Sequence, residues 1–131
     1  MTEGNLEVVR SLYEATEARD LEAGARLTHP DAVWVPDRRV GQEPVRGREN
    51  VIRFFTERAD MFGEIHTEVE RLEAVDDTVL AFIRVSGRGE ASGAGFDIRI
   101  GHLWTLRDGV VVRGEGYGDR GAALEAAGLN D

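Results

Sequence analysis

Apolar positions in the first half of the chain follow a helical period. Between residues 5 and 18 they recur every three or four positions, which is the spacing of one face of an amphipathic helix. The same spacing returns from about Arg48 to Met61. Asp20 is a good N-cap for a short helix between these two, and His29-Pro30 would end it because the residue before proline avoids helical geometry. The pattern therefore predicts three helices in this half.

Strand patterns occur once before the last of these helices and dominate the second half. Segments of β-branched and apolar residues, bounded by turn residues, occupy positions 31–36, 64–75, 78–86, 96–106 and 110–119. Asp76-Asp77 and Arg107-Asp108-Gly109 predict tight turns between neighbouring strands. Gly87 to Gly95 contains four glycines and predicts a loop, and a short helix from about Arg120 to Ala127 would close the chain.

The order of these elements predicts the fold class. Helices that precede an uninterrupted run of strands indicate an α+β domain with its helices on one face of an antiparallel sheet. Strands of this length, with glycines in the last one, must twist and bend. We therefore expect one domain over residues 1–131, in which the N-terminal helices pack on the concave face of a cone-shaped curved sheet.

Composition narrows the classes of partner. The 131 residues suffice for one domain with its own core, and the absence of Cys excludes disulfides and thiolate metal sites. The formal net charge of -9 argues against nucleic acid and anionic membranes as partners. The chain lacks a basic, apolar leader, and no run approaches the roughly 18 apolar residues of a membrane span. A cytoplasmic protein is the expectation.

Several segments, taken together, resemble a known family. They are Arg19-Asp20-Leu21-Glu22, His29 to Trp34, Arg46-Gly47-Arg48-Glu49, Gly101 to Arg113, Tyr117 to Arg120 and Ala123 to Leu129. In these segments the chain is similar to the SnoaL-like branch of the nuclear-transport-factor-2-like superfamily, whose members share a cystatin-like α+β barrel. The resemblance implies a small-molecule pocket inside the cone and a homodimer that packs sheet against sheet. It leaves function open, because polyketide cyclases, ketosteroid isomerases, epoxide hydrolases, dehydratases and non-enzymatic binders share this fold.

Strand alternation assigns side chains to the interior. Along residues 96–106, Ile98, Ile100, His102, Trp104 and Leu106 share the apolar face, which we expect to look inward. The resemblance places the face of Gly114, Gly116 and Gly118 inside as well, where three glycines would leave a bare and roomy pocket floor. It also leaves Leu103, Val111 and Tyr117 on the convex face for a dimer partner.

The strand 78–86 is apolar on both faces, and the preferred inward set is Leu80, Phe82 and Arg84. The predicted pocket lining is Tyr13, Trp34, Phe54, Phe55, Phe62, Phe82, Ile98, Ile100, Trp104, Gly114, Gly116 and Gly118.

His102 and Arg84 are the candidate catalytic residues. A neutral imidazole in an apolar cone suits general acid–base chemistry near neutral pH, whereas the alternative is a buried histidine that only holds the sheet in register. Arg84 would clamp an oxyanion or carboxylate, or else pair with Glu68 or Glu70 across the strands. Trp34 and Trp104 would stack against a ligand or simply pack in the core.

Other kinds of site find little support. His29, His66 and His102 are far apart in sequence and lack metal-site spacing, so we expect neither a metal nor a cofactor. The carboxylate sets of ketosteroid isomerases and limonene-epoxide hydrolases are missing at the matching positions, which hold Pro36 and Gly116 among others. Acid–base chemistry would then depend on His102, with Arg84, Asp31 or Asp37 as its helper.

Two functional hypotheses follow. In the first, the protein is a cofactor-independent isomerase, cyclase or dehydratase that acts on a small hydrophobic carbonyl compound through proton transfer by His102. In the second, it is a non-catalytic domain that binds a hydrophobic ligand or serves as a structural dimer. A protein–protein adaptor that uses the convex face is a third and weaker idea.

Overall fold

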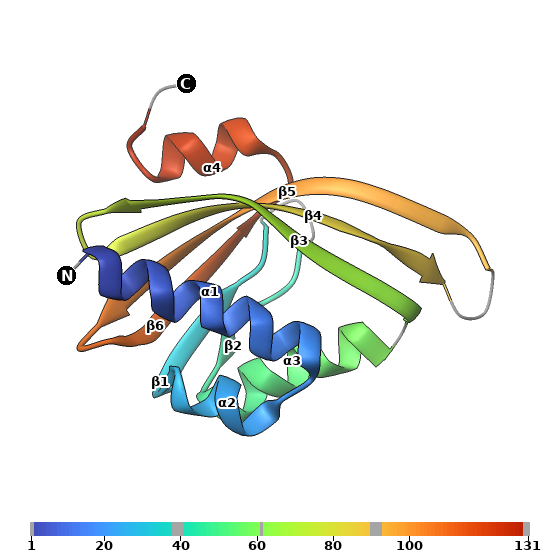
Figure 1. Ribbon diagram of the computed structural model, residues 1–131, viewed down its shortest axis with the longest axis horizontal. Coiled ribbons are helices and arrows are strands. Elements are labelled where there is room, and N and C mark those ends of the chain that lie inside the picture. Colours follow the sequence, from blue (N-terminus) through green and yellow to red (C-terminus); the bar gives the residue numbers. More distant parts are fainter. Residues whose placement is uncertain (1, 38–40, 61, 90–92, 130–131) are drawn as a thin grey trace.

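The computed structural model describes residues 2–37, 41–60, 62–89 and 93–129, with the backbone alone described at 2, 3, 59, 60 and 62–64. The helices are α1 (Thr2–Ala18), α2 (Leu21–Arg26), α3 (Arg48–Asp60) and α4 (Arg120–Ala126). The strands are β1 (Thr28–Val35), β2 (Val45–Arg46), β3 (Phe62–Val75), β4 (Thr78–Gly89), β5 (Gly95–Arg107) and β6 (Val110–Tyr117). They form a curved sheet in the order β2-β1-β6-β5-β4-β3, and α1, α2 and α3 lie on its concave side (Figure 1). This is the predicted α+β class.

The sequence predicted an antiparallel sheet, but one pair of neighbouring strands is parallel. β1 pairs with β6 in parallel, while the other neighbours pair antiparallel. β1 is also longer than expected, because it begins at Thr28 and includes Pro30. Its register against β6 shifts between Thr28 and Val33. A proline cannot donate a ladder hydrogen bond, so an irregular stretch of this kind is where a strand accommodates it.

Tight turns join the long strands as predicted. Asp76 has a φ of 55°, and Asp108 and Gly109 have φ values of 53° and 80°. Consecutive positive φ values, as at Asp108 and Gly109, give the turn the twist that an antiparallel hairpin requires. The predicted glycine loop is shorter than expected, since β4 continues to Gly89 and β5 begins at Gly95. Residues 90–92 of that loop lie outside the described residues.

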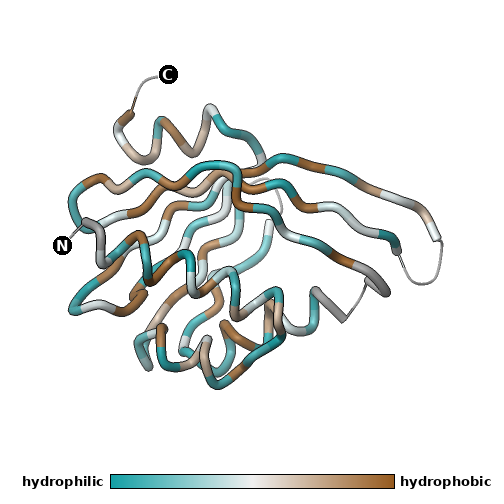
Figure 2. Tube along the Cα trace, in the orientation of Figure 1, coloured by the Kyte–Doolittle hydropathy of each residue, from teal (hydrophilic) through white to brown (hydrophobic). Residues whose placement is uncertain are grey.

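The main core lies between the concave face of the sheet and the helices. Its buried members are Val9, Trp34, Val51, Val79, Ala81, Ile83, Trp104, Leu106 and Val111. Figure 2 shows hydrophobic stretches on α1 and on the strands that it faces. Burying these side chains removes apolar surface from water, which is the main force that holds α1 and α3 against the sheet.

A second, smaller core lies on the convex face. Helix α4 packs there, on the side opposite the other three helices (Figure 1). Asp119 caps α4 by accepting a hydrogen bond from the backbone N–H of Ala122 at 2.8 Å. The buried members are Leu80, Phe82, Leu103, Ala123 and Leu124. The predicted packing on the concave face concerned the N-terminal helices, and α4 adds a helix on the opposite face.

No helix of the described segments is long and apolar enough to cross a membrane.

Candidate functional site

A chain of three side chains crosses the interior of the cone. The indole N–H of Trp104 donates a hydrogen bond to the hydroxyl oxygen of Tyr13 at 2.8 Å. The same hydroxyl lies 2.7 Å from Nδ1 of His102. Tyr13 comes from α1, whereas His102 and Trp104 stand two residues apart on β5 and so point to the same side of the sheet. Packing α1 across the sheet therefore assembles this chain.

Aromatic rings surround the imidazole. The ring of Trp34 lies edge-on to His102 with centroids 5.1 Å apart, and its centroid is 5.4 Å from that of Trp104. Phe55 of α3 packs edge-on against Trp34 at 4.9 Å. His102 itself is only 7% exposed. Its other ring nitrogen, Nε2, has no hydrogen-bond partner among the described residues.

Burial keeps the titratable groups of this chain uncharged. It lowers the pKa of His102 from 6.5 to about 3, and the positive charge of Arg58 contributes in the same direction. Burial also raises the pKa of the Tyr13 hydroxyl far above its ordinary value, although the hydrogen bond from Trp104 opposes this shift. At neutral pH the site therefore contains a neutral imidazole and a neutral phenol.

The space beside the inward glycines Gly114 and Gly116 is filled by tryptophan rings and does not form an open pocket floor. A Cβ placed on Gly114 would stand 2.6 Å from Trp104 and 2.7 Å from Trp34. On Gly116 it would stand 3.0 Å from Trp34. Both glycines do face inward, opposite Trp104 and His102, as expected. The prediction that they expose a roomy floor is wrong, because the two indoles occupy that space.

Comparison with models of protein families shows to which family the chain is related. The model of the SnoaL-like domain matches residues 9–114 of the chain. This chain belongs to the SnoaL-like domain family. The family resemblance seen in the sequence is thus confirmed.

Solved structures show that this SnoaL-like protein shares its fold with several others. A protein from Jannaschia sp. CCS1, proposed to be a SnoaL-like polyketide cyclase, is 22% identical with a TM-score of 0.81, over 99% of this chain and 95% of that one. IdmH from Streptomyces antibioticus, proposed to be a polyketide cyclase, is 22% identical with a TM-score of 0.78, over 95% and 99%. TerC, co-crystallised with polyporic acid, is 23% identical with a TM-score of 0.78, over 95% and 98%. No curated protein gives a significant match.

Arg84 and Phe82 do not face the interior of this SnoaL-like protein. The register of β4 places Val79, Ala81 and Ile83 inward, so Phe82 belongs to the convex core. Arg84 lies on the same convex face, where its Nε donates to Asp97 at 2.8 Å and its side chain is 39% exposed. This pairing raises the pKa of Arg84 and lowers that of Asp97. The expectation that Arg84 reaches a ligand inside the cone is wrong.

The remaining predicted lining residues divide into three groups. Phe54 and Ile100 are partly buried and pack against the concave core. Ile98, near the start of β5, is 49% exposed, and Gly118 is exposed beyond the end of β6. The side chain of Phe62 lies outside the described residues.

The proposed carboxylate helpers also differ in position. Asp31 is exposed, and its backbone N–H bonds to Nδ1 of its neighbour His29 at 2.9 Å. Asp37 accepts a hydrogen bond from the backbone N–H of Gly118, and its backbone nitrogen lies within 3.8 Å of a Cβ built on Gly116. Gly116 pairs with His102, so the backbone of Asp37 lies beside the residue that is paired with the imidazole-bearing one.

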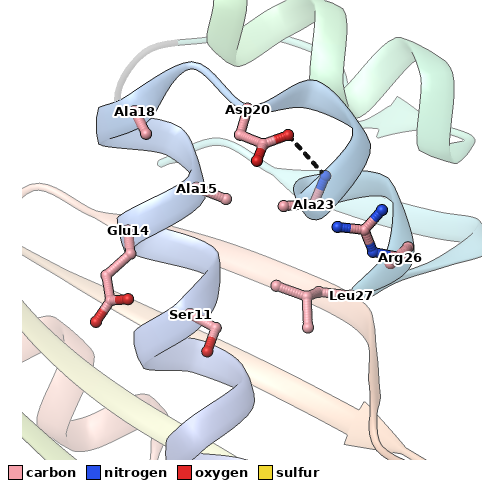
Figure 3. A pocket seen from close by; sticks show the side chains of 8 residues that line it. All are labelled: Ser11, Glu14, Ala15, Ala18, Asp20, Ala23, Arg26 and Leu27. Atoms are coloured by element: carbon pink, nitrogen blue, oxygen red, sulfur yellow. Dashed lines mark hydrogen bonds between the residues drawn. The ribbon is translucent and has the colours of Figure 1, made fainter.

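Two hollows lined by described residues open on the surface beside α1. One, of about 400 Å³, lies between α1 and α2 and is lined by Ser11, Glu14, Ala15, Ala18, Asp20, Ala23, Arg26 and Leu27 (Figure 3). The other, of about 490 Å³, is lined by Arg10, Tyr13, Glu14, Glu17, Ala18, Thr67 and Val69. Tyr13 thus contributes its hydroxyl to the buried chain and also borders the second hollow.

Sequence reasoning missed the bond between Tyr13 and His102. It placed both residues in the interior but did not pair them, since they are 89 positions apart. The available signal was Tyr13 itself, an aromatic residue with a polar tip on the apolar face of a helix. A buried tyrosine usually finds a hydrogen-bond partner, and His102 and Trp104 were the inward polar groups expected from β5.

Proposed function

We propose that this SnoaL-like protein binds a small hydrophobic carbonyl compound within its cone and acts on it through His102, as a cofactor-independent isomerase, cyclase or dehydratase. The observation that supports this most directly is the state of His102. Its imidazole is buried among aromatic rings and held at Nδ1 by Tyr13, while Nε2 has no partner among the described residues. Among the described residues, Nε of Arg120 is the one buried side-chain nitrogen or oxygen without a partner, so Nε2 of His102 is not sealed off from its surroundings and a ligand oxygen would be able to pair with it.

The surroundings of His102 suit an apolar ligand with one polar group. Trp34 and Phe55 offer ring surfaces, and the imidazole is the polar handle beside them. Binding sites for small molecules typically combine an apolar lining with a few such polar groups. TerC, a protein of the same fold, was co-crystallised with polyporic acid, which agrees with small-molecule binding in this architecture.

Binding can be tested with 1-tetralone and with tetralin, the same ring system without the carbonyl. The two tryptophans of the chain, Trp34 and Trp104, both lie in the cone, so fluorescence excited selectively at tryptophan reports on this region. We expect 1-tetralone to quench it saturably and to raise the melting temperature, with tetralin much weaker. A ligand at 100 times its Kd adds about 2.7 kcal/mol to the stability. Equal responses to both compounds would contradict recognition of the carbonyl.

Turnover can be tested by exchange of the α-protons of 1-tetralone in D₂O, followed by NMR. We expect exchange above background with the wild-type protein and none with His102→Ala or His102→Gln. His66→Gln is the matched control, because His66 is exposed on β3. Both His102 variants are needed, since alanine leaves a cavity while glutamine keeps a polar side chain. Unchanged exchange in folded variants would exclude a role for His102.

A non-catalytic ligand-binding domain is the second candidate, favoured by the low pKa of His102. An imidazole with a pKa of about 3 is a poor base for a reaction at neutral pH. Saturable binding of 1-tetralone without any exchange would support this candidate over the enzyme.

The homodimer implied by the resemblance stays a prediction. Its expected convex surface is altered, because Leu103 and Tyr117 pack with α4 and Val111 points into the concave core. Sedimentation at micromolar concentration would show whether the remaining convex surface associates.

A further inference from the structure

The hydrogen bonds around Tyr13 restrict where the imidazole of His102 carries its proton. An indole nitrogen can only donate, so the bond from Trp104 makes the hydroxyl oxygen of Tyr13 an acceptor. The contact between that oxygen and Nδ1 of His102 is 2.7 Å long and needs one proton between the two atoms. Either the phenol donates to Nδ1, or a protonated Nδ1 donates to the phenol.

The two arrangements differ in what they leave unpaired. If Nδ1 donated, the oxygen of Tyr13 would accept two bonds and its own proton would have no acceptor among the described residues. A buried donor without a partner costs about 1–3 kcal/mol. If Tyr13 donates, Trp104, Tyr13 and Nδ1 are all satisfied and only Nε2–H has no partner among the described residues, whereas the other arrangement leaves both the phenol proton and Nε2 unpaired. The neutral imidazole then carries its proton on Nε2.

We propose that Tyr13 is a positioning residue that holds His102 in the tautomer protonated at Nε2, so that His102 meets the ligand as a neutral hydrogen-bond donor. This inference rests on the proposed function for its ligand, but the tautomer itself belongs to the free protein. The group recognised would be a carbonyl or another oxygen acceptor. A neutral imidazole can polarise a carbonyl by donating a hydrogen bond, without transferring its proton. Any base that removes a ligand proton must then be another group.

The tautomer can be measured directly by NMR on protein labelled with ¹⁵N-histidine at pH 7. The two ring nitrogens of a neutral imidazole differ in ¹⁵N shift according to which one bears the proton. We expect the His102 signals, assigned by their loss in His102→Gln, to show a protonated Nε2 and an unprotonated Nδ1. A protonated Nδ1 would overturn the inference.

Variants of the two tyrosines of the chain make a matched pair. Tyr13→Phe removes the proton donor, so the Nδ1 signal should move away from that of a hydrogen-bonded acceptor. Tyr117→Phe removes a hydroxyl that donates to Glu115 at 3.0 Å on the other side of the sheet, and the His102 signals should not change. Unchanged signals in Tyr13→Phe would contradict the positioning role. If Tyr13→Phe does not fold, two measurements still test the positioning role. One is the tautomer of His102 in the wild-type protein. The other is the same tautomer in Trp104→Phe, where the Tyr13 oxygen no longer accepts a hydrogen bond from the indole.

Addition of 1-tetralone separates this inference from the proposed function. If Nε2 carries the proton but 1-tetralone neither binds nor exchanges, the proposed function fails and the tautomer assignment stands. If 1-tetralone binds while Nδ1 carries the proton, binding stands and the inference fails. If both hold, the Nε2–H signal should shift with 1-tetralone and not with tetralin.

Discussion

The two faces of the sheet handle polar groups in opposite ways. On the concave face, Tyr13, His102 and Trp104 form one neutral hydrogen-bond chain sealed by aromatic rings. On the convex face the polar groups are charged and exposed, as in the pair of Arg84 with Asp97. A buried polar group depends on its few partners, whereas an exposed ion pair can exchange its partner for water. Changes inside the cone should therefore have large and specific effects, and changes outside it small ones.

The largest difference between the faces should come from two glycines. A Cβ on Gly114 would overlap two tryptophan rings, and a Cβ on Gly101 would stand 2.5 Å from the Cβ of Ala123 in α4. The indoles are enclosed by the rest of the core, while α4 has seven residues and covers the sheet from outside. Gly114→Ala should lower the free energy of unfolding by about 3 kcal/mol, and Gly101→Ala by less, because overpacking costs most where neighbours cannot move.

Urea unfolding of both variants would measure this difference. Gly24→Ala is the control, since its added Cβ meets nothing within 4 Å in helix α2. Alanine there should be neutral or stabilise by about 0.5–1 kcal/mol, as expected in a helix interior. If Gly101→Ala proved the more damaging of the two, the concave interior would be the more adaptable side, contrary to this comparison.

Acidification should lower the free energy of unfolding through the buried His102, by an amount between those of the other two predictions. His102 has a pKa of about 3 when folded and 6.5 as a model group, so the unfolded chain binds its proton first as the pH falls. The free energy of unfolding should therefore decrease from about pH 6.5 towards pH 3, by about 1.4 kcal/mol per pH unit, or about 2 kcal/mol at pH 5. Below pH 3 this residue contributes no further change.

Comparing variants at several pH values isolates the contribution of His102 from those of the carboxylates. Unfolding of the wild type and of His102→Gln should diverge in their pH dependence between pH 6.5 and 3, with the shallower slope in the variant. His66→Gln serves as the control for replacing a histidine that is exposed on β3. Parallel curves for the wild type and His102→Gln would mean that the imidazole is more accessible to protons than its burial indicates.

The same contrast between faces explains what the sequence could predict. β5 alternates between apolar and polar residues, so its inward set, with His102 and Trp104, followed from the pattern. β4 is apolar on both faces, because α4 covers its outer side, and periodicity alone could not choose its register. Phe82 and Arg84 were placed on the wrong face for this reason.

Two other features depend on contacts that no local pattern records. The register shift between Thr105 and Leu106 turns Val111 into the concave core. The parallel pairing of β1 with β6 joins segments from opposite ends of the chain. Neither has a marker in the residues nearby, since tertiary packing decides both. The bond between Tyr13 and His102 is of the same kind, because it exists only once α1 has packed on the sheet.

The smallest effect is expected for the ion pair of Arg84 with Asp97, although it consists of two hydrogen bonds. Nε and a terminal nitrogen of Arg84 donate to the two carboxylate oxygens of Asp97, yet both side chains are open to solvent. A double-mutant cycle with Arg84→Gln and Asp97→Asn should give a coupling free energy typical of exposed pairs, and added salt should reduce it further. Urea unfolding at low and high ionic strength measures it. A coupling as large as the cost of Gly114→Ala, and insensitive to salt, would show that this face is shielded from water by something that binds over it. The same result would support association through the convex surface. The coupling free energy of this pair is therefore also a sensitive test of the contrast between the two faces.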